Sequence, residues 1–186
     1  MVEKAVILLK FGKLNNNKYE KINEFKDSNE LSDGLEIKDN EIILYALDTN
    51  PKSLVFYNLI KKEKIKTLNN LQLYITNLIR IIKINDNEVA VAGDGKVYLI
   101  DINNYLILHE INSDCCNHCI LKLSNNLFLI GDQKGTITQY KIENKKLIKE
   151  SFKNKSHENY ISSMTILNDM IISGNGDKNE IKIWKN

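Results

Sequence analysis

The sequence predicts an all-β protein built from a repeated four-stranded antiparallel sheet, and three observations support this. Near the C-terminus, the β-branched and apolar runs 161–167, 171–174 and 181–184 are separated by polar, Gly- and Asn-rich turns. A polar dipeptide before each second strand recurs at intervals of roughly 40 to 45 residues. These dipeptides are Asp39-Asn40, Asp86-Asn87, Asn125-Asn126 and Asn168-Asp169. The ends of the third strands have the same period, at Tyr57, Ile100, Tyr140 and Trp184.

In chain order, two strand-like runs within residues 5–25 come first, joined by the polar link 12–17. The polar segment 26–33 has no periodic pattern and is expected to be a loop. The repeats that follow span 35–68, 79–111, 119–152 and 161–186, and the last of them stops after its third strand. The second strands are apolar at successive positions, as in Val89 to Ala92, which predicts burial on both faces.

Residues 69–84 fit this scheme least well. Their apolar residues are compatible with a strand pair or with a short helix inserted between two repeats. Because Ile, Thr and Tyr are frequent in the segment, we favour strand.

Composition narrows the possible function classes. The 186 residues are 42% hydrophobic, which is ordinary for a globular protein with a substantial core. Charged residues make up 27%, but the net charge is only +2, so no strong field attracts nucleic acid or an anionic membrane. Arg80 is the only arginine, which leaves little for bidentate recognition of phosphates or bases. We expect neither nucleic acid nor membrane as a partner.

The termini and cysteines predict a cytoplasmic location. The first apolar run is short and is broken by Lys10, unlike a signal peptide, and no stretch approaches the length of a membrane span. Three cysteines, Cys115, Cys116 and Cys119, are bunched and odd in number, so they do not form a disulfide framework. A reducing compartment is the natural interpretation.

The last repeat carries a motif of four residues. His157 precedes its first strand, Ser173 lies late in its second, Asp177 lies in the following turn and Trp184 lies in its third strand. This motif, with the repeat period, resembles the WD-repeat β-propeller family. The resemblance implies a propeller with about four blades here. It also implies a structural tetrad in which His157 bridges the Ser173 hydroxyl and the Asp177 carboxylate while the Trp184 indole donates a hydrogen bond inward.

The earlier repeats depart from this motif. Repeat 119–152 has Ile130 in place of the Ser, Lys134 in place of the turn Asp and Tyr140 in place of the Trp. Repeat 79–111 keeps Asp94 in its turn but has Ile100 at the Trp position. These repeats therefore lack the full network.

No residue pattern predicts catalysis or metal binding. The Cys115–Cys119 cluster has no second, distant pair of ligands, so we expect no metal and no cofactor. The glycines around Asp94 precede neither a helix nor a Lys-Ser or Lys-Thr pair and are expected to serve the turn rather than a phosphate. His109, His118 and His157 occupy different places in the repeat, and no nucleophile elbow accompanies them. We expect no catalytic residues and do not expect an enzyme.

The resemblance implies a non-catalytic scaffold or adaptor that binds a protein or peptide through loops gathered on one face of a propeller. The turns between second and third strands and the loops before first strands share that face. The exposed contact residues expected there are Asp94, Lys96, Asp132, Lys134, Tyr160 and Lys178. The alternative is a hydrolase-like or lipid-binding propeller, although the adjacent Arg pair of the phosphoinositide-binding propellers is missing.

The number of blades raises a question of closure. Members of the family mostly close with seven or eight blades, so about four blades are expected to leave apolar faces open. We therefore expect the chain to be part of a larger propeller or to form a homodimer, for instance by exchange of the strand at residues 19–25. The competing possibility is a four-bladed ring closed within one chain.

Overall fold

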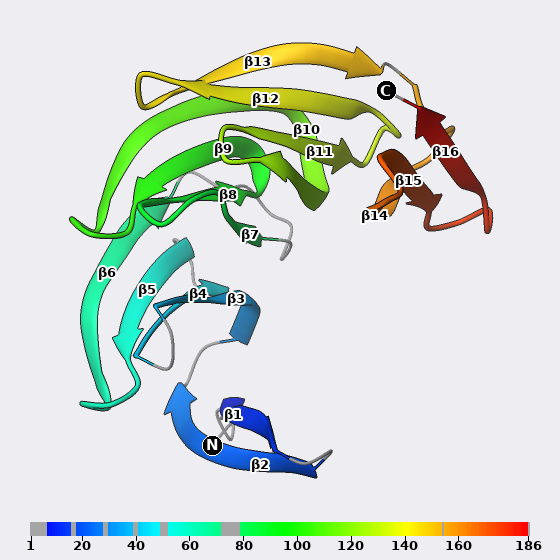
Figure 1. Cartoon of the computed structure of the whole chain (residues 1–186). Helices are drawn as coiled ribbons and strands as arrows, with labels where there is room; N and C mark the ends of the chain where they lie inside the picture. The colour runs from blue at the N-terminus through cyan, green and yellow to red at the C-terminus, as the bar shows by residue number, and fades with distance from the viewer. Residues whose placement is uncertain are drawn as a thin grey trace, which may run out of the picture. The chain divides into compact units, whose positions relative to one another are not determined.

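The computed structural model describes residues 7–15, 18–27, 30–38, 41–48, 52–71, 79–153 and 155–185. The chain divides into two compact units, residues 1–71 and 72–186, shown from blue to red in Figure 1. In the part of the chain that is described, every regular element is a β-strand, and all paired strands are antiparallel. The prediction of an all-β fold is confirmed.

The first unit contains a two-stranded and a four-stranded sheet. The two-stranded sheet pairs β1 (Ile7–Asn15) with β2 (Lys18–Asp27). The other sheet follows chain order: β3 (Glu30–Lys38), β4 (Ile42–Asp48), β5 (Lys52–Asn58) and β6 (Glu63–Leu71). Cross-strand pairs Leu44 with Phe56 and Ala46 with Leu54 are fully buried on one face of this sheet. Direct neighbours on one face of a sheet stabilise each other, so these pairs form the core of the four-stranded sheet.

The prediction of a loop at residues 26–33 was wrong. Strand β2 continues through Asp27, and β3 already begins at Glu30. Glu30 and Leu31 are paired in register with Asp48 and Leu47 of β4. Pairing with β4 satisfies the backbone N–H and C=O groups of β3 whatever its side chains are. A polar segment can therefore extend a strand when a neighbouring strand is there to pair with it.

The second unit contains a seven-stranded and a three-stranded sheet, each in chain order. The seven strands are β7 (Arg80–Lys83), β8 (Glu88–Ala92), β9 (Asp94–Asp101), β10 (Leu106–Ser124), β11 (Leu127–Asp132), β12 (Ile137–Glu143) and β13 (Lys146–Lys153). The three strands are β14 (Ile161–Leu167), β15 (Met170–Asn175) and β16 (Ile181–Lys185). Of the segment 69–84, residues 69–71 end β6 and residues 80–83 form β7, while 72–78 lie outside the described residues.

Strand β10 is the main departure from the expected repeats. Its 19 residues include both the predicted last strand of repeat 79–111 and the first strand of repeat 119–152. The first part pairs with β9 and the last part with β11, with an irregularity between Asn112 and Cys116. No Gly or Pro interrupts this segment, so the backbone stays extended across the predicted loop. Strand β10 is therefore shared by two sets of four strands, β7–β10 and β10–β13.

Strand β11 lies between two hydrophobic clusters because alternate side chains point to opposite faces. Phe128 and Ile130 belong to a cluster with strands β8, β9 and β12, whereas Leu129 belongs to a cluster with Ile161 and Ile171 of β14 and β15. Gly131 permits the close approach of β14, since a Cβ there would lie 2.9 Å from the Ile161 Cβ. Burial of β11 on both faces agrees with its continuous apolar sequence.

Candidate functional site

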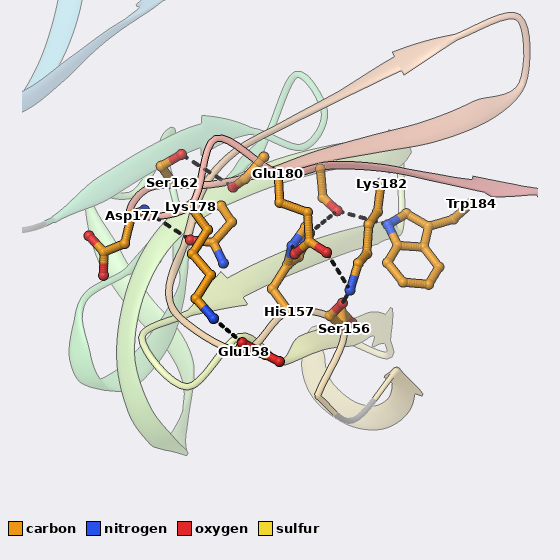
Figure 2. Close-up of polar contacts among 12 residues, drawn as sticks. Ser156, His157, Glu158, Ser162, Asp177, Lys178, Glu180, Lys182 and Trp184 are labelled. Atoms are coloured by element: carbon orange, nitrogen blue, oxygen red, sulfur yellow. Dashed lines mark hydrogen bonds and ion pairs between the residues drawn. The ribbon is translucent and has the colours of Figure 1, made fainter.

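A buried polar network ties the segment before β14 to strands β15 and β16 (Figure 2). His157 Nε2 lies 2.7 Å from the Ser173 Oγ, and the Trp184 Nε1 donates to the same oxygen at 2.8 Å. The other His157 nitrogen, Nδ1, lies 2.7 Å from the Glu180 Oε2. A neutral His157 that carries its proton on Nδ1 donates to Glu180 and accepts from the Ser173 hydroxyl, so each of these groups has a partner.

The predicted fourth member, Asp177, is not in this network. Its backbone N–H donates to the Asn175 Oδ1 at 2.9 Å, and Figure 2 shows its side chain directed away from His157. Glu180, at the end of the turn next to β16, takes the expected place of Asp177. Its carboxylate also pairs with Lys182 at 3.1 Å. The hydrogen bond from His157 and then that from Lys182 lower the pKa of the Glu180 carboxyl. The tight turn was predicted correctly, but the carboxylate that contacts His157 belongs to Glu180, three residues after the predicted Asp177.

Turns, connecting segments and the irregular middle of β10 lie at one edge of the second unit. We call this the loop edge: residues 93–95, 113–118, 132–135, 155–160 and 176–180. Backbone hydrogen bonds link neighbouring segments, from Gln133 to Cys116 at 2.9 Å, from His157 to Gly135 at 3.0 Å and from Gly176 to Tyr160 at 3.2 Å. Gly135 has φ +78°, and a Cβ there would lie 2.1 Å from the His157 oxygen. Only glycine suits this crossing, so the segments are held in a defined arrangement.

Two of the predicted contact residues, Lys96 and Asp94, form contacts within the fold. Lys96 is 8% exposed, and its Nζ lies 2.6 Å from the Glu110 Oε1 on β10. The Asp94 Oδ1 accepts from the Cys116 thiol at 2.8 Å. Lys96 thus lies in the sheet, not on an exposed loop as expected.

Asp132 and Lys134 lie together in the turn after β11. The buried Asp132 accepts backbone N–H groups of Lys134 at 2.9 Å and Thr136 at 2.8 Å through one oxygen, Oδ1, which fixes the turn. Burial raises the pKa of the Asp132 carboxyl, although these two N–H groups oppose the shift. The Lys134 side chain is exposed, and its Nζ approaches the Asp114 carbonyl at 3.5 Å.

A polar cleft of about 470 Å³ opens beside this turn. Its lining comes from the loop edge and from the adjoining strands β12 and β13. The lining residues are Ser113, Asp114, Asn117, Asp132, Lys134, Thr136, Thr138, Tyr140 and Lys149. Asp114 and Lys149 form an ion pair at the cleft, with the Asp114 side chain 80% exposed. Asp132 and Lys134 were predicted from the sequence, but Asp114 and Lys149 were not, because Lys149 lies on a fourth strand far from any predicted loop.

Tyr160 and Lys178 occupy a separate part of the loop edge. The Tyr160 ring lies 4.9 Å from the His118 ring and covers Gly176, where a Cβ would lie 2.0 Å from the Tyr160 Cζ. Exposed Lys178 forms an ion pair with exposed Glu158. These side chains are therefore accessible at the edge, but none of them lines the cleft beside Asp132.

The cysteine cluster adds no metal site within the described ranges, where no group of three or more His, Cys, Asp or Glu side chains is placed to hold an ion. Cys119 is buried against the Ile161 carbonyl at 3.3 Å, and burial raises the pKa of its thiol to about 12. Its thiol stays protonated and serves packing. Over the same residues, no helix is long and apolar enough to span a membrane.

Comparison with known proteins gives similarity of fold only. No family model matches the chain, and no curated protein matches it. The chain is similar to the solved structure of the computationally designed Ika4 protein, with TM-score 0.66 and 16% identity over 84% of this chain and 91% of that one. The designed Ika8 protein gives the same TM-score and identity over 84% of this chain and 46% of its own.

A chain in the crystal structure of a Mitotic Checkpoint Complex is similar with TM-score 0.75 and 10% identity, over 96% of this chain and 59% of that one. The present chain thus spans nearly the whole of Ika4, but about half of Ika8 and three fifths of the checkpoint-complex chain. At these identities the similarity concerns the arrangement of strands and not the activity.

Proposed function

We propose that the chain is a WD-repeat-like β-propeller module, or part of one, that acts as a non-catalytic scaffold and binds a peptide segment of a partner protein at the loop edge. Successive antiparallel sheets and the motif of His157, Ser173 and Trp184 support the propeller. The similarity to a chain of a Mitotic Checkpoint Complex supports a role among protein partners. The observation that carries the proposal is the polar cleft beside the Asp132 turn.

Two lysines and two aspartates line the cleft, and the lysines favour a partner with an acidic residue. Lys149 pairs with the carboxylate of Asp114, which is largely exposed, whereas the Lys134 Nζ lies 3.5 Å from the Asp114 backbone carbonyl. Exposed ion pairs contribute only about 0 to 1 kcal/mol, so an incoming carboxylate exchanges with Asp114 at little cost. The Ser113, Thr136 and Thr138 hydroxyl groups along the lining offer hydrogen bonds to a peptide backbone. Among the described residues, no comparable contact favours the hydrolase or the lipid-binding alternative.

The test is affinity capture from the native cell followed by mass spectrometry, with charge reversal at the cleft. Lys134→Glu with Lys149→Glu is expected to lose partners that the wild type captures. Lys145→Glu with Lys146→Glu is the matched control, because these lysines are exposed at the β12–β13 turn, at the opposite end of the same strands. An unchanged partner set for the cleft variant, or equal loss in the control, would reject the loop edge as the binding site.

A further inference from the structure

Two buried polar residues of the cleft have hydrogen-bonding capacity that the fold does not use. Asp132 and Tyr140 line the cleft, although they are 8% and 1% exposed. Asp114, Lys134 and Lys149 line the same cleft and are exposed. We call Asp132 and Tyr140 the floor pair, because a ligand reaches them only after it has passed the exposed residues.

Asp132 uses one of its two carboxylate oxygens. Both N–H groups that fix its turn donate to Oδ1. Within the part of the chain that the structure describes, no group donates a hydrogen bond to the Asp132 Oδ2 and no cation forms an ion pair with it, since the Lys134 ammonium approaches the Asp114 carbonyl instead. Burial raises the pKa of the Asp132 carboxyl, so its surroundings do not fully compensate its charge.

Asp101, which ends β9, is a buried aspartate that uses both oxygens. It is 7% exposed, and its Oδ1 accepts the backbone N–H groups of Asn103 at 2.8 Å and Asn104 at 2.9 Å. Its Oδ2 accepts the side-chain amide of Asn104 at 3.0 Å. Asp132 has similar burial and also fixes a turn, but it lacks this second partner. A buried acceptor without a partner costs stability, so a ligand that brings a donor gains from it.

The Tyr140 hydroxyl is the second unused group. The Tyr140 ring packs in the hydrophobic cluster of strands β8, β9, β11 and β12, while the residue also lines the polar cleft. Burial first, and then the charges of Asp114 and Asp132, raise the pKa of the hydroxyl, so this end of the side chain lies near both carboxylates. Ile130 stands where β15 has the serine that accepts from its indole, and among the described residues the Tyr140 hydroxyl forms no hydrogen bond.

On the basis of the peptide binding proposed above, we propose that the floor pair binds a basic side chain of the partner segment, next to the acidic residue that contacts the cleft lysines. An ammonium or guanidinium group donates to the Asp132 Oδ2 and to the Tyr140 oxygen, so both gain a partner. A neutral amide could also donate to Asp132, but it would leave the buried charge uncompensated.

The charges of the lining agree with this assignment. Two lysines and two aspartates line the cleft, so its charges balance. An acidic residue that replaces Asp114 at Lys149 brings a third carboxylate to the cleft. A basic residue from the same segment restores the balance. Thr138 lies two positions before Tyr140 on β12, on the same face, and offers the cation a further hydroxyl acceptor. The cleft therefore favours a segment with charges of both signs over a purely acidic one.

An array of synthetic peptides titrated with the purified chain tests this inference. One series carries a central glutamate and places lysine, arginine, glutamine or leucine at each flanking position in turn. The wild type is expected to bind the best basic peptide about tenfold more tightly than its glutamine counterpart, because hydrogen bonds between charged groups are the stronger ones. A second series replaces the central glutamate by glutamine and keeps the flanking residues.

Two isosteric variants separate the floor pair from the fold. Asp132→Asn keeps the Oδ1 acceptor of its turn and should abolish the preference for the basic peptide. Tyr140→Phe keeps the packed ring and should weaken binding of the basic peptide about threefold, as expected for one neutral hydrogen bond. Asp101→Asn is the matched control and should keep the full preference, because Asp101 lies at the end of β9 away from the loop edge.

The two series distinguish failure of this inference from failure of the acidic contact. Binding that requires glutamate but shows no basic preference, or a preference that persists in Asp132→Asn, would overturn the role of the floor pair and leave the acidic contact in place. A basic preference that Asp132→Asn abolishes, without any requirement for glutamate, would support the floor pair and reject the acidic contact. Absence of binding to every peptide would reject both.

Discussion

Strands β10–β12 and β14–β16 repeat one arrangement but hold their third strand differently. In β14–β16, the Trp184 indole donates to Ser173, which contacts His157. At the equivalent place in β12, Tyr140 is 1% exposed and stacks on Phe128, with ring centroids 5.4 Å apart. One set of strands uses a polar network and the other uses aromatic packing.

The difference follows from how many faces are covered. Strand β11 has apolar neighbours on both sides, so van der Waals contacts and apolar burial are available to hold Tyr140. Among the described residues, the apolar neighbours of strand β16 lie on one side, and its outward isoleucines are exposed. A satisfied buried network supplies directional contacts where apolar contacts are fewer. The polar network therefore lies in the sheet that has fewer apolar contacts.

The largest expected effect is at Tyr140. Tyr140→Ala should lower the free energy of unfolding by about 3 to 5 kcal/mol, because a large cavity adds to the lost burial. Denaturant unfolding followed by circular dichroism measures this. Tyr105→Ala, in the turn before β10, is the control and should cost far less because Tyr105 is only half-buried. If Tyr140→Ala lowered the free energy of unfolding by less than about 1 kcal/mol, aromatic packing would not be what holds β12 in place.

Ser173→Ala should produce the next largest effect. It removes both the acceptor of the Trp184 indole and the partner of His157 Nε2, leaving buried polar groups unsatisfied at a cost of about 1 to 3 kcal/mol. Calorimetric unfolding measures the change. Ser163→Ala, an exposed serine on β14, is the matched control. If the two alanine variants melt at the same temperature, the network does not stabilise β14–β16.

How far the sequence predicted this structure depends on the kind of signal. Alternation and turn residues predicted β14–β16 closely, and Asn168 and Asp169 adopt the positive φ values of 48° and 62° expected of a tight turn. The continuous strand β10 was missed because pairing with β9 and β11 outweighs a locally polar sequence. At the site, the resemblance to the WD-repeat motif indicated His157, Ser173 and Trp184. It could not distinguish Asp177 from Glu180, because side-chain reach decides which carboxylate meets His157.

Glu180→Gln tests whether the network uses an ionised carboxylate. The pKa of the Glu180 carboxyl is lowered from its ordinary 4.5, mainly by the hydrogen bond from His157 and next by that from Lys182. Because the folded pKa is the lower one, the contribution is present above pH 4.5 and is lost as the pH falls through the folded pKa. The wild type should therefore be more stable than Glu180→Gln at neutral pH, and the difference should disappear in acid. Thermal unfolding across this pH range provides the measurement, with Asp177→Asn, an exposed carboxylate of the same turn, as the control for lost charge alone.

Asp132→Asn should have the smallest effect and the opposite dependence on pH. Burial raises the pKa of Asp132 above 3.8, so its favourable contribution exists below that pH and is lost as the pH rises through the folded pKa. At neutral pH the buried charge therefore costs stability. Asparagine keeps an Oδ1 acceptor for the Lys134 and Thr136 N–H groups without the charge. We expect the variant to melt slightly above the wild type at neutral pH, with the gain vanishing in acid. A lower melting temperature at neutral pH would mean that the Asp132 charge stabilises its turn, and the two carboxylates would then act alike instead of in opposite directions.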